Sequence, residues 1–133
     1  MAKTKQFTIA VQNQPGTVAG ISRTLGNAKV NILSLLATAT AQGTTGTVQL
    51  VVEDAKRARK PLDEAGLTYQ ETDAEQYELP NKPGALAQYL DKLAAKGVNL
   101  NSVHATASKG GRKAVVVYTV ETATKAAAAT ATT

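Results

Sequence analysis

The amino-acid sequence repeats itself at a constant offset of 68 residues, and this internal repeat limits the fold more than any other feature. The clearest match is Asn13-Gln14-Pro15-Gly16, which returns as Asn81-Lys82-Pro83-Gly84. The other matches at this offset are Ala19 with Ala87, Leu25 with Leu93, Val30-Asn31-Ile32 with Val98-Asn99-Leu100, Ser34 with Ser102, Thr38 with Thr106, Val48 with Val116 and Val52 with Val120. So many matches at one constant offset are poorly explained by chance. The sequence therefore predicts two copies of one small unit.

The first copy combines four predicted strands with two predicted helices. Apolar residues alternate or run together in the four segments that predict strands, which are residues 7–11, 31–41, 47–53 and 67–72. The first helix follows Pro15-Gly16, since Pro is well tolerated near a helix start. Val18, Ile21, Ser22 and Leu25 follow at three- and four-residue spacing, which places them on one face of this helix. The order of elements is therefore βαββαβ.

The second helix of the first copy is predicted to begin after Asp54, whose carboxylate can cap it. Ala58, Leu62 and Ala65 give this helix an apolar side, and Gly66 suits its C-terminal end. Pro61 is awkward inside a helix. We therefore expect the helix to start late, to bend or to be irregular.

The second copy is predicted to be shorter than the first. Strands are expected at residues 76–79, 98–108 and 113–121, and a helix with its apolar face at Leu86, Tyr89, Leu90 and Leu93. The offset maps the second helix onto residues 123–133, an Ala/Thr-rich tail that we expect to be frayed rather than helical. Nothing remains for a fourth strand. We thus expect units at residues 1–73 and 74–133, the second lacking its last strand, with the tail from about residue 122.

A missing fourth strand would leave the edge of residues 76–79 unpaired, and sheet edges are usually covered. Either residues 67–72 or a second chain could cover this edge. The sequence therefore predicts a homodimer or close pairing of the two units.

This order of elements predicts an α+β ferredoxin-like fold, in which helices cover one face of an antiparallel sheet. That fold hosts unrelated functions. The repeated Asn-x-Pro-Gly turn, followed by a helix and then by Val-Asn-Ile or Val-Asn-Leu, is more specific. In both copies it resembles the ACT domain, and the resemblance extends to Glu121.

The resemblance implies a regulatory module that pairs with another ACT domain and binds a small ligand, often an amino acid, at the interface. By position, the implied ligand-binding residues of the first unit are Asn13, Gln14, Pro15, Gly16, Thr17, Val18 and Asn31. Those of the second unit are Asn81, Lys82, Pro83, Gly84, Ala85, Leu86 and Asn99. Some serine-binding relatives carry a histidine two positions before the turn asparagine. Val11 and Leu79 stand there in this chain, so serine specificity is not implied.

The turn chemistry suits an amino acid on its own terms. Backbone N–H groups at a helix start favour a carboxylate, and an asparagine side chain offers both an acceptor for the ammonium group and a donor for the carboxylate. An equally weighted alternative is that each asparagine only closes its turn or caps its helix. The two sites need not be equivalent, because Gln14 is neutral and Lys82 is cationic.

Several function classes are disfavoured by what the chain lacks. It has no cysteine and one histidine, His104, so a His/Cys metal cluster cannot form within one chain. Asp63 with Glu64, and Asp73 with Glu75, lack a nearby nucleophile and are interpreted as solvated. The glycines near residues 43–46 and 110–111 predict hairpin turns rather than a phosphate loop. We expect no enzymatic activity, no cofactor and no metal.

The leading hypothesis is a free-standing, cytoplasmic, amino-acid-binding regulatory protein, for which a metabolic enzyme is a candidate target. The alternative is a partner-binding or RNA-binding ferredoxin-like module without a small ligand. The net charge of +5 is compatible with RNA, but RNA-binding sheets of this kind stack bases on strand aromatics, and the predicted third strands hold only Tyr118. The basic residues Lys56, Arg57, Arg59 and Lys60 are interpreted as a solvated helix face rather than a phosphate or partner patch. The N-terminus resembles neither a signal peptide nor a membrane span.

Overall fold

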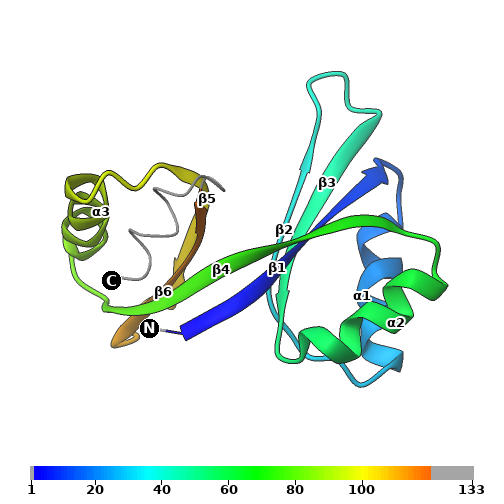
Figure 1. Cartoon of the computed structure of the whole chain (residues 1–133), viewed down its shortest axis with the longest axis horizontal. Helices are drawn as coiled ribbons and strands as arrows, with labels where there is room; N and C mark the ends of the chain where they lie inside the picture. Colours follow the sequence, from blue (N-terminus) through cyan, green and yellow to red (C-terminus); the bar gives the residue numbers. More distant parts are fainter. Residues whose placement is uncertain (1, 121–133) are drawn as a thin grey trace. The chain divides into compact units, whose positions relative to one another are not determined.

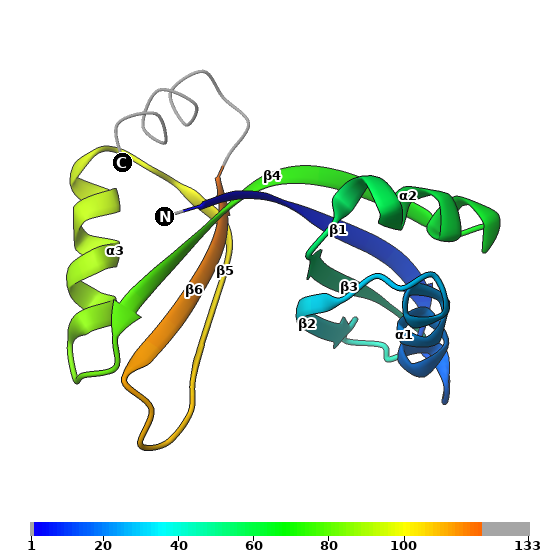
Figure 2. The same cartoon turned by 90° about the horizontal axis from the view of Figure 1, so that it is seen from below.

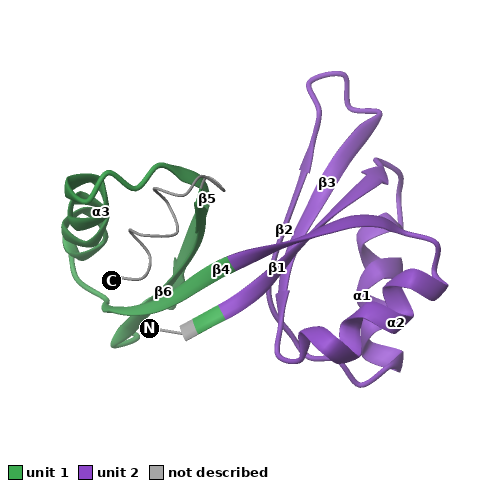
Figure 3. Ribbon diagram, in the orientation of Figure 1, with its two compact units in different colours: residues 1–3, 74–133 green, residues 4–73 purple. Residues whose placement is uncertain are grey.

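The computed structural model describes residues 2–120. The elements in chain order are β1 (Ala2–Gln12), α1 (Thr17–Asn27), β2 (Ile32–Ala39), β3 (Thr45–Val52), α2 (Ala55–Glu64), β4 (Thr68–Pro80), α3 (Ala85–Ala95), β5 (Leu100–Ala107) and β6 (Lys113–Val120) (Figure 1). They form two compact units (Figure 3). The N-terminal unit comprises Thr4–Asp73, and the C-terminal unit comprises the chain from Ala74 together with the start of β1.

The N-terminal unit is a sheet covered on one face by two helices. Its strand order is β2-β3-β1-β4, in which β3 pairs antiparallel with both β2 and β1. Helices α1 and α2 pack against each other and against this sheet (Figure 1). This is the predicted ferredoxin-like arrangement, and the prediction is confirmed.

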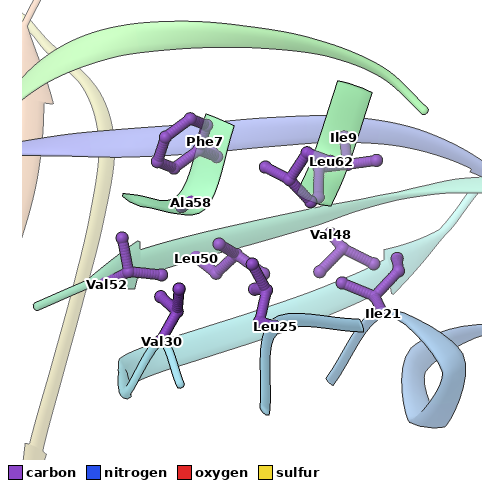
Figure 4. Close-up of a cluster of buried hydrophobic side chains, with 10 residues drawn as sticks. All are labelled: Phe7, Ile9, Ile21, Leu25, Val30, Val48, Leu50, Val52, Ala58 and Leu62. Atoms are coloured by element: carbon purple, nitrogen blue, oxygen red, sulfur yellow. The ribbon is translucent and has the colours of Figure 1, made fainter. Parts of the chain in front are cut away.

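The core of the N-terminal unit lies between the sheet and the two helices (Figure 4). Alternation along the strands decides which side chains enter it, because successive residues of a strand point to opposite faces. The core contains Phe7 and Ile9 from β1, Val48, Leu50 and Val52 from β3, Ile21 and Leu25 from α1, Ala58 and Leu62 from α2, and Val30. Leu25 and Leu62 are fully buried.

Helix α2 begins directly after Asp54, as the cap predicted, so the late start considered because of Pro61 is wrong. The carboxylate of Asp54 accepts a hydrogen bond of 3.1 Å from the backbone N–H of Arg57. Pro61 lies inside the helix, which nevertheless continues to Glu64. The missing N–H of Pro61 removes one possible donor, and the helix tolerates this loss while Leu62 holds it against the core.

The C-terminal unit has the strand order β4-β6-β5 with α3 packed on one face (Figure 2). At the offset of 68 residues, its three tyrosines occupy positions that hold aliphatic core residues in the N-terminal unit. Tyr77 matches Ile9, Tyr89 matches Ile21 and Tyr118 matches Leu50. The rings of Tyr77 and Tyr89 stack with centroids 4.5 Å apart. The hydroxyls of Tyr89 and Tyr118 are 3.0 Å apart.

The prediction of separate strands at residues 67–72 and 76–79 is wrong. These segments belong to one continuous strand, β4, which runs from Thr68 to Pro80. No glycine or proline lies between Gly66 and Pro80 to interrupt the extended backbone. Residues 67–72 therefore cannot cover the edge of residues 76–79, because the two are consecutive parts of the same strand.

The repeat extends to irregular features. The ladders of β2 with β3 and of β5 with β6 each shift register at matching positions, between Ile32 and Ser34 and between Leu100 and Ser102. The predicted Ala/Thr-rich tail, and the question of a second helix or a last strand in the second unit, fall outside the described residues. None of the described helices is long and apolar enough to cross a membrane.

Candidate functional site

The asparagine of each Asn-x-Pro-Gly turn binds the neighbouring hairpin turn. The Nδ2 of Asn13 donates to the Gly43 carbonyl at 2.7 Å, and its backbone N–H donates to the Thr44 carbonyl at 3.0 Å. The Nδ2 of Asn81 donates to the Gly111 carbonyl at 2.9 Å and to the Ser108 carbonyl at 3.2 Å. Each asparagine therefore links its turn to the neighbouring hairpin, which differs from the predicted alternative that it closes its own turn or caps its helix. Within residues 2–120, neither side-chain Oδ1 has a hydrogen-bond donor, so this oxygen can accept one from a ligand.

The glycine of each turn places the chain at the start of a helix. Gly16 and Gly84 have φ angles of 88° and 85°, a left-handed conformation that favours glycine. No side chain caps either α1 or α3. The first turn of a helix leaves backbone N–H groups without an intrahelical partner. The N–H groups of Thr17 and Ala85 donate to the Gln14 and Lys82 carbonyls at 3.2 Å, so the donors left for a ligand belong to the residues that follow them in each helix.

The remaining turn residues differ between the units. Thr17 donates its hydroxyl to the Gln12 carbonyl at 2.9 Å, whereas its counterpart Ala85 has no hydroxyl. Val18 packs against the N-terminal core, while its counterpart Leu86 is 39% exposed. The turn residues Gln14, Pro15, Lys82 and Pro83 are all exposed.

Asn31 and Asn99 lie away from the turns of their own units. Asn31 precedes β2, and its Nδ2 donates to a carboxylate oxygen of Glu53 at 3.0 Å. Glu53 follows the end of β3, whereas the hairpin turn bound by Asn13 precedes its start. An eight-residue strand is about 26 Å long, so Asn31 is far from Asn13 within one unit. Asn99 is likewise separated from Asn81 by the length of β6, and it makes no side-chain hydrogen bond in the described chain.

A groove of about 540 Å³ in the N-terminal unit begins at the first turn. Gly16 and Thr17 line it, together with Gly20, Arg23 and Thr24 of α1, the loop at residues 65–67, Thr68 of β4, and the end of β1. A side chain added at Gly20 would enter open space. Gly20 and Thr24 were not among the predicted site residues, although their four-residue spacing from Gly16 would have placed all three on one helix face.

A second groove, of about 520 Å³, lies at the β2–β3 hairpin of the same unit. Threonines from β2, β3 and β4 dominate its lining, and the Oγ1 atoms of Thr38 and Thr47 are 3.2 Å apart. Residues 10–12 of β1 border both grooves. The lining offers hydroxyl groups and no charged side chain.

His104 is placed unlike a catalytic base. It lies on β5 opposite Val117 of β6, and both of its ring nitrogens are buried without a hydrogen-bond partner in the described chain. Burial lowers the pKa of His104 below the ordinary value for histidine, because desolvation disfavours the charged ring. No group of three or more His, Asp or Glu residues within residues 2–120 could hold a metal ion.

A comparison with protein families identifies the family of this chain. The model for the ACT domain pair matches residues 2–131. This chain belongs to the ACT domain pair family. The resemblance inferred from the two Asn-x-Pro-Gly turns is thereby confirmed, and so are the antiparallel ferredoxin-like sheets. ACT domains are regulatory, ligand-binding modules.

Solved structures share the fold of this chain. A protein of Bacteroides thetaiotaomicron is 26% identical with a TM-score of 0.83, and the match covers 98% of this ACT domain pair and 88% of that chain. The ligand-free regulatory subunit of aspartate kinase from Thermus thermophilus is 16% identical with a TM-score of 0.65, covering 98% and 91%. The corresponding subunit from Thermus flavus is 15% identical, with the same TM-score and coverage. No curated protein matches the chain.

Proposed function

We propose that this ACT domain pair is a non-catalytic regulatory protein that binds a free amino acid at its Asn-x-Pro-Gly turns. One observation carries the proposal. Each turn joins a helix start that lacks a side-chain cap to an asparagine whose NH₂ group is anchored, and within residues 2–120 the Oδ1 of that asparagine has no donor. A zwitterion fits this pair, because the N–H groups suit its carboxylate and Oδ1 suits its ammonium group.

The first turn fits a neutral zwitterion better than the second. Gln14 and the hairpin residues 41–45 carry no charge, so the field at this turn comes from the backbone and from amides. The groove that starts at Gly16 and Thr17 gives a side chain of the ligand somewhere to lie. Arg23 lines the same groove and favours a ligand side chain with acceptor atoms.

A second copy of the chain completes the site in this proposal. Asn31 and Asn99 lie a strand's length from the turns of their own units, so they would reach a ligand only from a paired ACT domain. We therefore propose a homodimer with the ligand at an ACT–ACT interface. Light scattering coupled to size-exclusion chromatography tests this, and a monomer that persists at high protein concentration would contradict it.

A metabolic enzyme in the cytoplasm is the proposed target, by analogy with the regulatory subunits of aspartate kinase. Co-purification from cell extract, with and without the amino acid that binds, would identify the enzyme. The alternative of RNA binding has less support. Tyr118 of β6, the aromatic residue that the sequence offers for stacking on a base, is fully buried.

The test of amino-acid binding is a calorimetric screen of the protein amino acids against the purified protein. The informative variants are Asn13→Asp and Asn81→Asp, which replace the NH₂ donor with a carboxylate oxygen at nearly constant size. Asn101→Asp is the matched control, because Asn101 is exposed on β5 outside both turns. We expect one turn variant to abolish binding and the control to preserve it. If no amino acid binds, or if all three variants bind equally, the proposal fails.

A further inference from the structure

The second Asn-x-Pro-Gly turn is surrounded by cations that the first turn lacks. Lys82 lies in the turn itself, the β5–β6 turn contributes Lys109 and Arg112, and Lys113 begins β6. We call these four residues the basic turn cluster. At the matching positions of the first unit the chain has Gln14, Ala41, Thr44 and Thr45, none of which is charged. The difference is therefore four positive charges at otherwise similar turns.

Hydrogen bonds and strand pairing bring the basic turn cluster together. The backbone N–H of Asn81, next to Lys82, donates to the Arg112 carbonyl at 3.0 Å. The Asn81 side chain donates to the Ser108 carbonyl, next to Lys109, at 3.2 Å. Lys113 pairs with Pro80 across the β4–β6 ladder. All four basic side chains are exposed.

Within residues 2–120, no neighbouring side chain neutralises the charges of the cluster. None of the four forms an ion pair within the described part of the chain. Residues 79–90 and 100–120 contain no Asp or Glu. The acidic residue closest along the strands is Glu78, which pairs with Val115 and lies diagonal to Lys113. Like charges at these exposed positions repel one another only weakly in salt solution, so the cluster can stay unneutralised until an anion binds.

We propose that the basic turn cluster binds the phosphate group of a phosphorylated small molecule. A phosphate carries a charge of about −1.5 to −2 and three strong acceptor oxygens, which suits several cations better than one carboxylate does. The Arg112 guanidinium can bind two of those oxygens at once, while the lysines provide point charges. At the start of α3 the N–H of Ala85 donates to the Lys82 carbonyl, and the N–H groups that follow it add backbone donors.

The compactness of the cluster favours a small molecule over a nucleic acid. A nucleic-acid strand is bound by cations and aromatic platforms spread along several nucleotides. Here the unpaired cations lie on two adjoining turns, and the tyrosines of the C-terminal unit belong to its core. The four cations make this turn less suited than the first turn to the ammonium group of a free amino acid. The inference thus goes beyond amino-acid binding at the first turn and does not depend on it.

The test measures calorimetric binding of inorganic phosphate, pyrophosphate and ATP at low ionic strength. The informative variant is Lys82→Gln/Arg112→Gln. The matched control is Lys56→Gln/Lys60→Gln, which removes the same number of charges from exposed positions on α2. We expect at least one probe to bind the wild type, the turn variant to weaken it by roughly tenfold or more, and the control to change it little. Circular dichroism shows whether each variant is folded.

Four results would overturn the inference. The first is absence of binding by all three phosphate probes, and the second is equal weakening by the turn variant and the α2 control. The third is binding of aspartate or glutamate that is as tight as that of ATP and is weakened equally by Lys82→Gln/Arg112→Gln. The fourth is binding of an RNA oligonucleotide with a steep salt dependence while the small probes do not bind. Amino-acid binding and its response to Asn13→Asp are measured separately, so either proposal can fail alone.

Discussion

Matched leucine truncations give a quantitative test of the two cores. Leu25 and Leu93 occupy equivalent positions on α1 and α3 and are 0% and 1% exposed. Replacing a buried leucine with alanine costs about 2–5 kcal/mol, more where the surroundings cannot collapse. Leu25 lies in a core of ten buried residues and Leu93 in one of six. We expect Leu25→Ala to fall in the upper half of this range and Leu93→Ala in the lower half.

Urea unfolding measures these losses. The chain has no tryptophan, and three of its four tyrosines belong to the C-terminal unit, so tyrosine fluorescence reports mainly on that unit. Far-ultraviolet circular dichroism reports on both units. With a slope of about 1–3 kcal/mol per molar urea for a small protein, Leu25→Ala should lower the circular-dichroism midpoint by about 1 M or more.

The control for both truncations is Leu33→Ala, because Leu33 is 50% exposed on β2. We expect it to change the free energy of unfolding by no more than about 0.5 kcal/mol. If Leu25→Ala and Leu33→Ala have the same midpoint, the assignment of Leu25 to the core is refuted. If Leu93→Ala costs more than Leu25→Ala, core size does not govern the loss.

Four further predictions concern single positions. Gly46→Ala should destabilise the protein by about 2 kcal/mol or more in thermal unfolding, because the new Cβ would lie 2.3 Å from the Thr38 carbonyl oxygen. Gly20→Ala, with open space around the new Cβ, should stabilise α1 by about 0.5–1 kcal/mol. Neutral His104, whose ring nitrogens are buried, stabilises the fold above its unfolded pKa of about 6.5 and loses this contribution as pH falls through its lowered folded pKa. His104→Asn should therefore flatten the dependence of the melting temperature on pH below about 6.5, and an unchanged dependence would contradict this. Asp54→Ala should lower the free energy of unfolding by about 1 kcal/mol, and Asp54→Asn, which keeps the cap acceptor, should lower it by less. Equal denaturant midpoints for the two variants would refute the capping role.

Sequence reasoning captured the features that depend on local chemistry. The Asn-x-Pro-Gly turns, the Asp54 cap and the alternation that buries Val48 and Leu50 each follow from neighbouring residues, and the structure has all of them. Because the offset is constant, the elements predicted in one unit could be assigned to matching positions in the other. Even the register shifts repeat, although no residue pattern predicted them.

Features that depend on distant contacts were not predictable in this way. The distance between Asn13 and Asn31 depends on the length of β3 and on the pairing of β2 with it, which sequence spacing does not reveal. The groove at Gly20 exists because the loop at residues 65–67 lies across from α1. The basic turn cluster went unrecognised because its residues are divided between positions 82 and 109–113 and meet only through the hydrogen bonds of Asn81.

The continuity of β4 has a practical consequence for anyone who wishes to study one ACT domain alone. Thr68–Asp73 complete the sheet of the N-terminal unit, and Ala74–Pro80 begin the sheet of the C-terminal unit, without an intervening linker. Cutting the chain at this point would sever a strand and create a new chain end within a hydrogen-bonded ladder. The N-terminal fragment should therefore be extended, or its last strand redesigned with charged edge residues, before it is expressed separately.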